Sequence, residues 1–130
     1  FGVFNYPGGT GNALQVKGID ICGKTGTAEN FAKINGKRTK LQDHSIFVAF
    51  APKDKPKIAI AVLVENGCYG ARNAGPIAVL MIEKYLKGKV SRTDLEKRMF
   101  EVSLQGEYNK YFKTKIDSLL IPKTEESTEN

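Results

Sequence analysis

Gly-Lys-Thr-Gly-Thr-Ala-Glu, at residues 23–29, is the stretch of sequence on which the fold and the chemistry of this chain depend. It follows Ile-Asp-Ile-Cys at residues 19–22, whose β-branched and apolar side chains favour an extended backbone. We therefore expect residues 19–27 to form one β-strand that presents Lys24 and Thr25.

Two further strands are expected downstream. Residues 44–51 and 57–65 are rich in Ile, Val, Phe and Ala, and Pro52 stops the first of them. The polar segment between Asn30 and Asp43 contains Asn35-Gly36, a pair that favours the type I′ turn of a hairpin. Short connections predict an antiparallel meander in the order 19–27, 44–51 and 57–65.

Helices are expected after the strands. Pro76 suits the first turn of a helix, apolar residues then recur at helical spacing, and Gly88 is a good stop. Ser91 and Asp94 predict a capping box that opens a second helix, which we expect Gly106 to break before a weaker segment through Leu120. Residues 1–12 are expected to be loop. The predicted fold class is α+β, an antiparallel sheet with C-terminal helices.

Composition excludes several functions. The net charge of +6 comes from 20 basic and 14 acidic residues, and the basic run between Lys33 and Lys40 lacks interleaved aromatics, which indicates a solvated loop rather than nucleic-acid binding. Cys22 and Cys68 have no metal-ligand spacing and His44 is the only histidine, so we expect free thiols, no metal and no cofactor. The longest apolar run, residues 58–64, is too short to span a membrane.

A nucleotide-binding interpretation competes for the same stretch. Residues 18–25, Gly-Ile-Asp-Ile-Cys-Gly-Lys-Thr, match the P-loop pattern letter for letter. A P-loop needs a flexible turn followed by a helix whose N-terminus faces phosphate. The intervening Ile-Asp-Ile-Cys favours a strand, and Gly26 stands where the helix would begin, so this alternative predicts a helix starting at Lys24.

An extended Lys-Thr-Gly has another use, in serine acyl transfer to D-Ala-D-Ala-like substrates. Lys24 would supply positive charge to the substrate carboxylate and to the proton relay, and the Thr25 hydroxyl would donate to that carboxylate. Gly26 would let the substrate backbone approach, because it has no Cβ. The backbone N–H of Thr27 would donate to the oxyanion.

The ordered series of motifs resembles the class B penicillin-binding proteins, particularly the elongation type. It comprises residues 23–29, Asp-His-Ser-Ile-Phe-Val-Ala-Phe-Ala-Pro at 43–52, the strand ending in Glu65, and Gly-Pro-Ile-Ala at 75–78. The resemblance covers roughly residues 8–87. It implies a penicillin-binding and serine β-lactamase-like transpeptidase fold, with Lys24 and Thr27 as catalytic residues and Thr25, Gly26 and Thr27 as substrate-binding residues.

The resemblance also predicts what this chain lacks. The family needs a nucleophile in Ser-x-x-Lys and a second motif, Ser-x-Asn. Neither motif is met by any of the five serines: Ser45, Ser91, Ser103, Ser118 and Ser127. We therefore expect an incomplete enzyme that is inactive alone and whose other parts lie upstream of Phe1.

The resemblance sets the remaining expectations. Residues 1–89 would be the C-terminal part of the transpeptidase domain, 90–122 a helical extension and 123–130 a disordered tail. The partners would be peptidoglycan stem peptides, β-lactams and the upstream part of the same protein, with a strand-swapped homo-oligomer if the chain is isolated. The location would be the periplasmic side of the inner membrane, with the anchor upstream.

Overall fold

The central sheet has three antiparallel strands in the order β1-β4-β5, which confirms the predicted meander. The strands are β1 (Cys22–Ala28), β4 (His44–Ala51) and β5 (Ile58–Val64) in a computed structural model that describes residues 1–111. Thr25 lies opposite Phe47 and Lys24 opposite Val48, which sets the register of the first pair.

The first strand begins three residues later than expected. Ile19 forms an isolated bridge with Val16 around a turn in which Gly18 has a φ of 76°. A backbone with positive φ cannot continue an extended strand, and only glycine adopts it without strain. The regular pairing with β4 therefore starts at Cys22.

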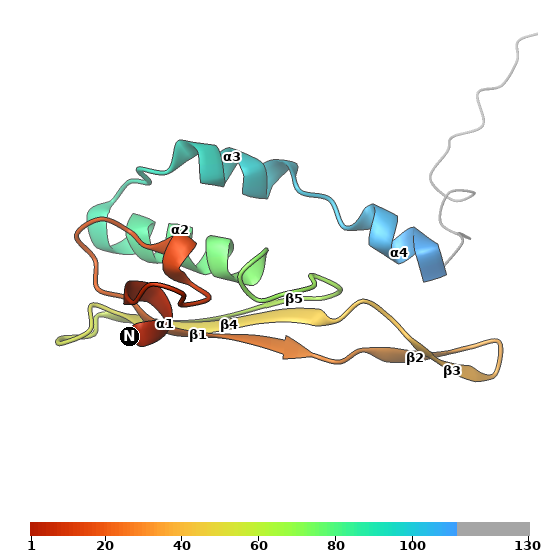
Figure 1. Cartoon of the computed structure of the whole chain (residues 1–130). Coiled ribbons are helices and arrows are strands. Elements are labelled where there is room, and N and C mark those ends of the chain that lie inside the picture. Colours follow the sequence, from red (N-terminus) through yellow and green to blue (C-terminus); the bar gives the residue numbers. More distant parts are fainter. Residues whose placement is uncertain (112–130) are drawn as a thin grey trace, which may run out of the picture.

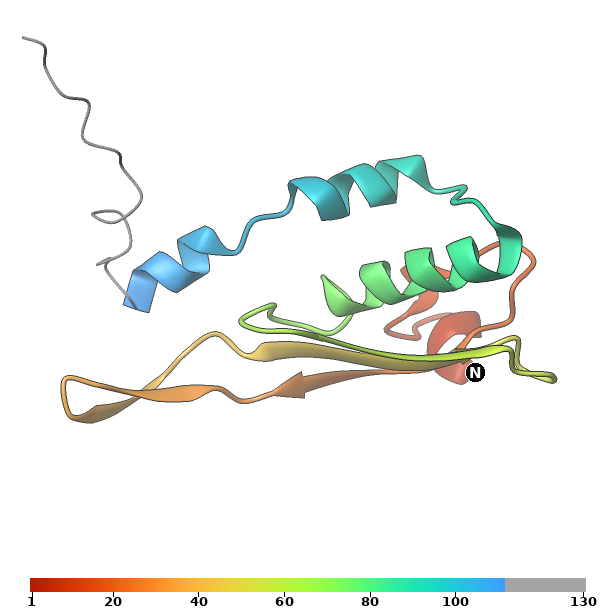
Figure 2. The same ribbon diagram turned by 180° about the vertical axis from the view of Figure 1, so that it is seen from behind.

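A separate hairpin connects β1 to β4. Its strands are β2 (Phe31–Ile34) and β3 (Lys37–Lys40), and it projects beyond the end of the main sheet (Figures 1 and 2). Asn35 and Gly36 both have positive φ, 49° and 79°, as the predicted type I′ turn requires. The basic residues of the segment are therefore displayed on an exposed two-stranded arm.

The core lies between the sheet and the helix α2 (Ala74–Lys87). Alternate residues of β4 point toward this helix and are buried, whereas the residues between them face away. Phe47 is fully buried and meets Phe4 edge to face, with ring centroids 5.6 Å apart. Gly88 ends α2 in the left-handed conformation, as expected of a C-terminal stop.

The helices form layers above one face of the sheet. Figures 1 and 2 view the sheet edge-on from opposite sides: α2 lies over the sheet, α3 (Thr93–Glu101) lies over α2, and the other sheet face is bare of both helices. That bare face exposes large apolar side chains: Val48, Phe50 and Leu63. Within residues 1–111, no helix is long and apolar enough to cross a bilayer.

Three local expectations were wrong. Residues 1–12 include a short helix, α1 (Gly2–Asn5), because Phe4 is buried against Phe47 and draws the segment onto the sheet. Gly106 does not break the second helix; α3 ends at Glu101 because Val102 is extended, and Gly106 lies inside α4 (Gln105–Tyr111).

The predicted capping box is also absent. Arg92 occupies the N-cap of α3 without a side-chain cap, and the Ser91 hydroxyl instead donates to the buried carboxylate of Glu83 in α2. Ser91 therefore binds the carboxylate of Glu83, eight residues away in α2, and does not cap the start of α3. The expected tail at 123–130, and the part of the weaker segment beyond Tyr111, lie outside the described residues.

Candidate active-site strand

The Lys-Thr-Gly residues lie on β1, at an edge of the sheet as the structure describes it. β1 pairs with β4 on one side, and no other described strand pairs with it. Lys24 and Thr27 are exposed, whereas Thr25 and Gly26 are half-buried. The strand therefore offers both backbone groups and side chains to a molecule that lies along its free edge.

The side chains of this strand divide between the two faces of the sheet. Thr25 shares a face with the buried Phe47, and its hydroxyl oxygen is 3.2 Å from that of Thr10. Lys24 shares the bare face with Val48, and its Nζ donates to the backbone oxygen of Thr25 at 2.7 Å. The ammonium group therefore folds back toward the strand edge.

A hollow on the bare face lies beside Lys24. It has a volume of about 600 Å³ and is bordered by Phe1, Val48 and Phe50 together with small residues of β5. The chain thus brings the positive charge of Lys24 to the rim of a largely apolar surface.

Gly26 has no reason within the described residues to be glycine. A Cβ built there would lie 3.4 Å from the Ile46 Cβ, which is ordinary contact, and the φ of Gly26 is not positive. Gly23 is different, because a Cβ there would lie 2.8 Å from Phe4 and 2.9 Å from Phe47. Packing accounts for Gly23, and Gly26 leaves space along the backbone for another molecule.

The loop before α2 closes over the strand, which the sequence analysis missed. A Cβ on Gly70 would lie 2.4 Å from the Ile46 oxygen and 3.0 Å from the Gly26 nitrogen, so this glycine lets the loop touch both strands. The buried Ser45 ties the loop to β4: its hydroxyl donates to the Tyr69 oxygen and accepts from the Ala74 N–H. The repeated glycines at 67 and 70 were the only sequence signal of this close approach.

Lys24 differs electrostatically from Lys40 in the hairpin. Lys40 lies 3.1 Å from Glu29 and 3.6 Å from Asp43, and its hydrogen bond to Glu29 raises the pKa of Lys40 above its usual value. Within residues 1–111, Lys24 has no carboxylate at ion-pair distance. Its charge is therefore available to an anion.

The nucleotide-binding alternative is excluded by the backbone. Lys24 and Thr25 lie inside β1, and no helix starts at Lys24. Among residues 1–111 no cluster of three or more His, Cys, Asp or Glu side chains could hold a metal ion. Cys22 is a buried free thiol, and Cys68 is a half-buried one with a φ of 67°.

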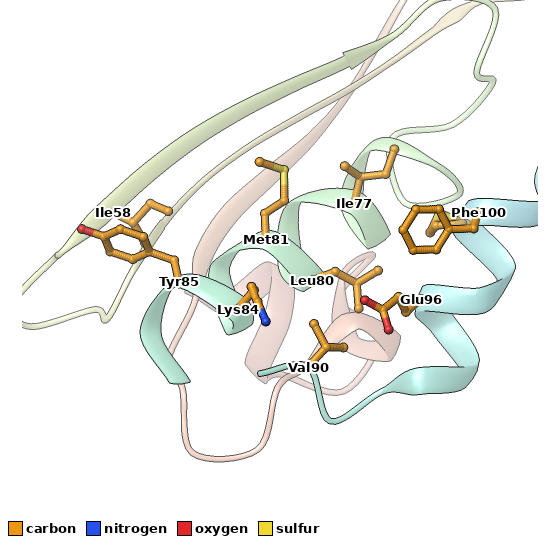
Figure 3. A pocket seen from close by; sticks show the side chains of 10 residues that line it. Ile58, Ile77, Leu80, Met81, Lys84, Tyr85, Val90, Glu96 and Phe100 are labelled. Carbon is orange, nitrogen blue, oxygen red and sulfur yellow. The ribbon is translucent and has the colours of Figure 1, made fainter. Parts of the chain in front are cut away.

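Another cavity has a mainly apolar lining. It has a volume of about 580 Å³ and lies between α2, α3 and the start of β5; Figure 3 shows lining residues that include Met81 and Tyr85 from α2 and Phe100 from α3. Lys84 and Glu96 are its only charged lining residues. With neither a nucleophile nor a Lys-Thr-Gly residue in its lining, it is not the candidate site.

The chain matches a known protein family and several known relatives. Residues 2–83 match the model of the penicillin binding protein transpeptidase domain. The peptidoglycan D,D-transpeptidase MrdA of Haemophilus influenzae is 34% identical over 102 residues, which are 72% of this chain and 16% of that protein. No solved structure matches the chain.

Other relatives give the same result. MrdA of Acinetobacter baumannii is 45% identical over 73 residues, 51% of this chain and 11% of that protein. The peptidoglycan D,D-transpeptidase PbpA of Mycobacterium tuberculosis is 40% identical over 79 residues, 57% of this chain and 15% of that protein. The chain thus spans less than a fifth of the length of these relatives, and it belongs to the penicillin-binding protein transpeptidase family, as a fragment of the class B type.

Proposed function

We propose that this chain forms one wall of the active site of a peptidoglycan D,D-transpeptidase, as the C-terminal part of a longer protein. The observation that carries the proposal is the Lys24–Thr27 segment on a strand edge that no described strand pairs with, where Lys24 and Thr27 are exposed and Gly26 is a glycine that packing does not require. The family membership of residues 2–83 supports it.

Each residue of the segment has a proposed role. Lys24 supplies the positive charge that orients the substrate carboxylate and assists the proton relay, and Thr25 donates its hydroxyl to that carboxylate. Gly26 admits the substrate backbone, and Thr27 contributes binding and a backbone N–H to the oxyanion. Fixed donors of this kind stabilise the charge that develops in the transition state, by about 3–4 kcal/mol for one donor.

The upstream part of the protein would supply what is missing. Its serine would attack the carbonyl of a stem peptide or a β-lactam, and an acyl-enzyme would form on that serine. The bare sheet face, the free edge of β5 and the apolar cavity beside α2 would be covered by upstream segments. In this scheme residues 1–89 complete the transpeptidase domain and residues 90–122 extend it.

The cellular setting follows from the same proposal. The protein would act on the periplasmic side of the inner membrane, anchored by an upstream segment, and it would cross-link lateral wall peptidoglycan and so contribute to cell shape. The elongation type is proposed because the series of motifs at residues 23–29, 43–52 and 75–78 resembles it.

A fluorescent penicillin tests the proposal. The full-length protein that contains this chain should form a stable adduct on an upstream serine, which mass spectrometry of the tryptic peptides locates. The isolated 130-residue chain should form none, because its serines lack the required base three residues on. An adduct on Ser45 or Ser91 of the isolated chain, or no adduct on the full-length protein, would refute it.

A further inference from the structure

A second cavity, about 490 Å³ in volume, includes in its lining Thr10, whose hydroxyl contacts that of Thr25 in the Lys-Thr-Gly strand. Its walls come from the 3-10 turn at Asn12–Leu14, the loop before α2, and α3. We propose that this cavity is a subsite for a carboxylate of an anionic peptide, distinct from the terminal carboxylate assigned to Lys24 and Thr25.

The charge of the lining favours an anion. Three arginines line the cavity, against one acidic side chain, that of Asp94. Arg92 is held in place, because its guanidinium donates to the Ala13 oxygen at 2.9 Å. Arg72 and Arg98 form no ion pair within residues 1–111. A guanidinium binds a carboxylate through two parallel hydrogen bonds, so two such groups in one cavity suit this ligand.

The cavity adjoins the proposed active-site wall. Thr10 lines it, and the Thr10 hydroxyl is 3.2 Å from the Thr25 hydroxyl. The loop that carries Arg72 also carries Gly70, which packs against the backbone of Gly26. A peptide bound along β1 is therefore next to the cavity, and a second carboxylate on it would reach the arginines.

Part of this subsite comes from outside the matched family region. Arg92 and Arg98 lie beyond residues 2–83, on the segment that leads into α3 and on α3 itself. The subsite would therefore be a specificity feature that the C-terminal extension adds to the domain. The identity of the ligand as a stem peptide rests on the proposed function; the preference for a carboxylate rests on the cavity alone.

Equilibrium binding to the full-length protein tests the subsite. The probes are two synthetic pentapeptides ending in D-Ala-D-Ala, identical except that an internal carboxylate in one is a carboxamide in the other. Titration calorimetry should show the carboxylate peptide binding about tenfold more tightly to the wild type, and less so as salt is raised. The double variant Arg72→Gln, Arg98→Gln should reduce this ratio to about one.

Two matched variants keep the result specific. Lys97→Gln removes a positive charge from the same helix but from outside this cavity, where Lys97 lies 3.8 Å from Glu101, and it should keep the full ratio. The double variant Arg72→Lys, Arg98→Lys, which keeps the positive charges, should keep part of the preference for the carboxylate peptide. The inference is overturned if the wild type shows no preference, or if Lys97→Gln lowers the ratio as much as the double variant. A preference that depends on the arginines, in a protein that penicillin does not label, would uphold the subsite and reject the proposed function.

Discussion

Gly23 and Gly26 stand three residues apart in one strand and are glycines for different reasons. Gly23 faces the rings of Phe4 and Phe47, so that any Cβ would collide with the core. Gly26 meets only ordinary contact from Ile46. The same residue type therefore serves packing at one position and, in our proposal, substrate approach at the other.

Alanine substitutions separate these two reasons. In the full-length protein, Gly26→Ala should leave the unfolding temperature unchanged or slightly raised, because glycine weakens a strand by roughly 0.5–1 kcal/mol relative to alanine. Acylation by penicillin should slow about tenfold or more, as expected for a clash worth about 1–3 kcal/mol. Gly23→Ala should lower the unfolding temperature instead. Equal rates of penicillin acylation in the Gly26→Ala variant and in the wild type would show that no substrate approaches this residue.

Thr25→Val tests the hydroxyl without changing the shape of the strand. A hydrogen bond to a charged group is worth about 1.5–3 kcal/mol, so acylation should slow by roughly ten- to a hundredfold. Stopped-flow absorbance with a chromogenic β-lactam measures the rate. Thr39→Val in the hairpin, whose hydroxyl donates to the Lys37 oxygen, is the control and should have little effect. Matching losses in the two variants would contradict the role of Thr25.

At the scale of the elements, a buried carboxylate joins α2 to the segment before α3. Glu83 is 1% exposed and accepts hydrogen bonds from the Ser91 hydroxyl and from the Ser91 N–H, with Lys87 3.7 Å away. Burial raises the pKa of Glu83, but the bonds from Ser91 and the charge of Lys87 outweigh it and hold the pKa below its usual value. Because the pKa is lower in the folded state, this stabilisation is present at neutral pH and is lost as the pH falls through that lowered pKa.

Ser91→Ala should therefore act in a pH-dependent way. At pH 7 the loss of the hydroxyl donor should cost about 1–2 kcal/mol of stability, since Glu83 would remain ionised with fewer partners. At an acidic pH the difference from wild type should shrink, because protonation of Glu83 removes the charge that the hydrogen bonds from Ser91 stabilise. Calorimetric unfolding of the full-length protein at the two pH values measures this. Ser103→Ala is the control, and the stability that it loses relative to wild type should not vary with pH. A loss in Ser91→Ala that is likewise independent of pH would show that the Ser91 hydroxyl does not stabilise the ionised Glu83.

Local sequence predicted the elements whose causes are local. Asn35-Gly36 predicted the hairpin turn, and Gly88 the end of α2, because each depends on the φ of one or two residues. The capping box predicted at Ser91 was wrong, because the carboxylate that the Ser91 hydroxyl binds lies eight residues away on a packed helix. The candidate site divides in the same way. The motif predicts Lys24 to Thr27 as site residues, whereas the contact of Gly70 with the backbone of Gly26 exists only in the folded chain.

At the scale of the whole molecule, the described residues leave one face of the sheet and one strand edge uncovered. The sheet face opposite α2 exposes Val48, Phe50 and Leu63, and β5 is an edge strand among the described residues. Unpaired edge strands and contiguous apolar faces promote association. These surfaces agree with a chain that spans under a fifth of its relatives.

The isolated 130-residue chain should therefore self-associate. Multi-angle light scattering is expected to show species larger than a monomer, increasing with concentration. Leu63→Lys places a charge on the bare face next to the β5 edge and should shift the population toward monomer. A clean monomer of the unmodified chain at high concentration would argue against the proposal that an upstream segment covers these surfaces.

The central claim is that β1 is an active-site wall, and the penicillin acylation rate of the full-length protein tests it most directly. Lys24→Ala removes a charge that no described carboxylate neutralises, whereas Lys37→Ala removes one from the projecting hairpin. We predict that Lys24→Ala slows acylation by more than the roughly ten- to hundredfold expected for Thr25→Val, and that Lys37→Ala leaves the rate nearly unchanged. Equal effects at Lys24 and Lys37 would contradict the assignment of this strand to the active site.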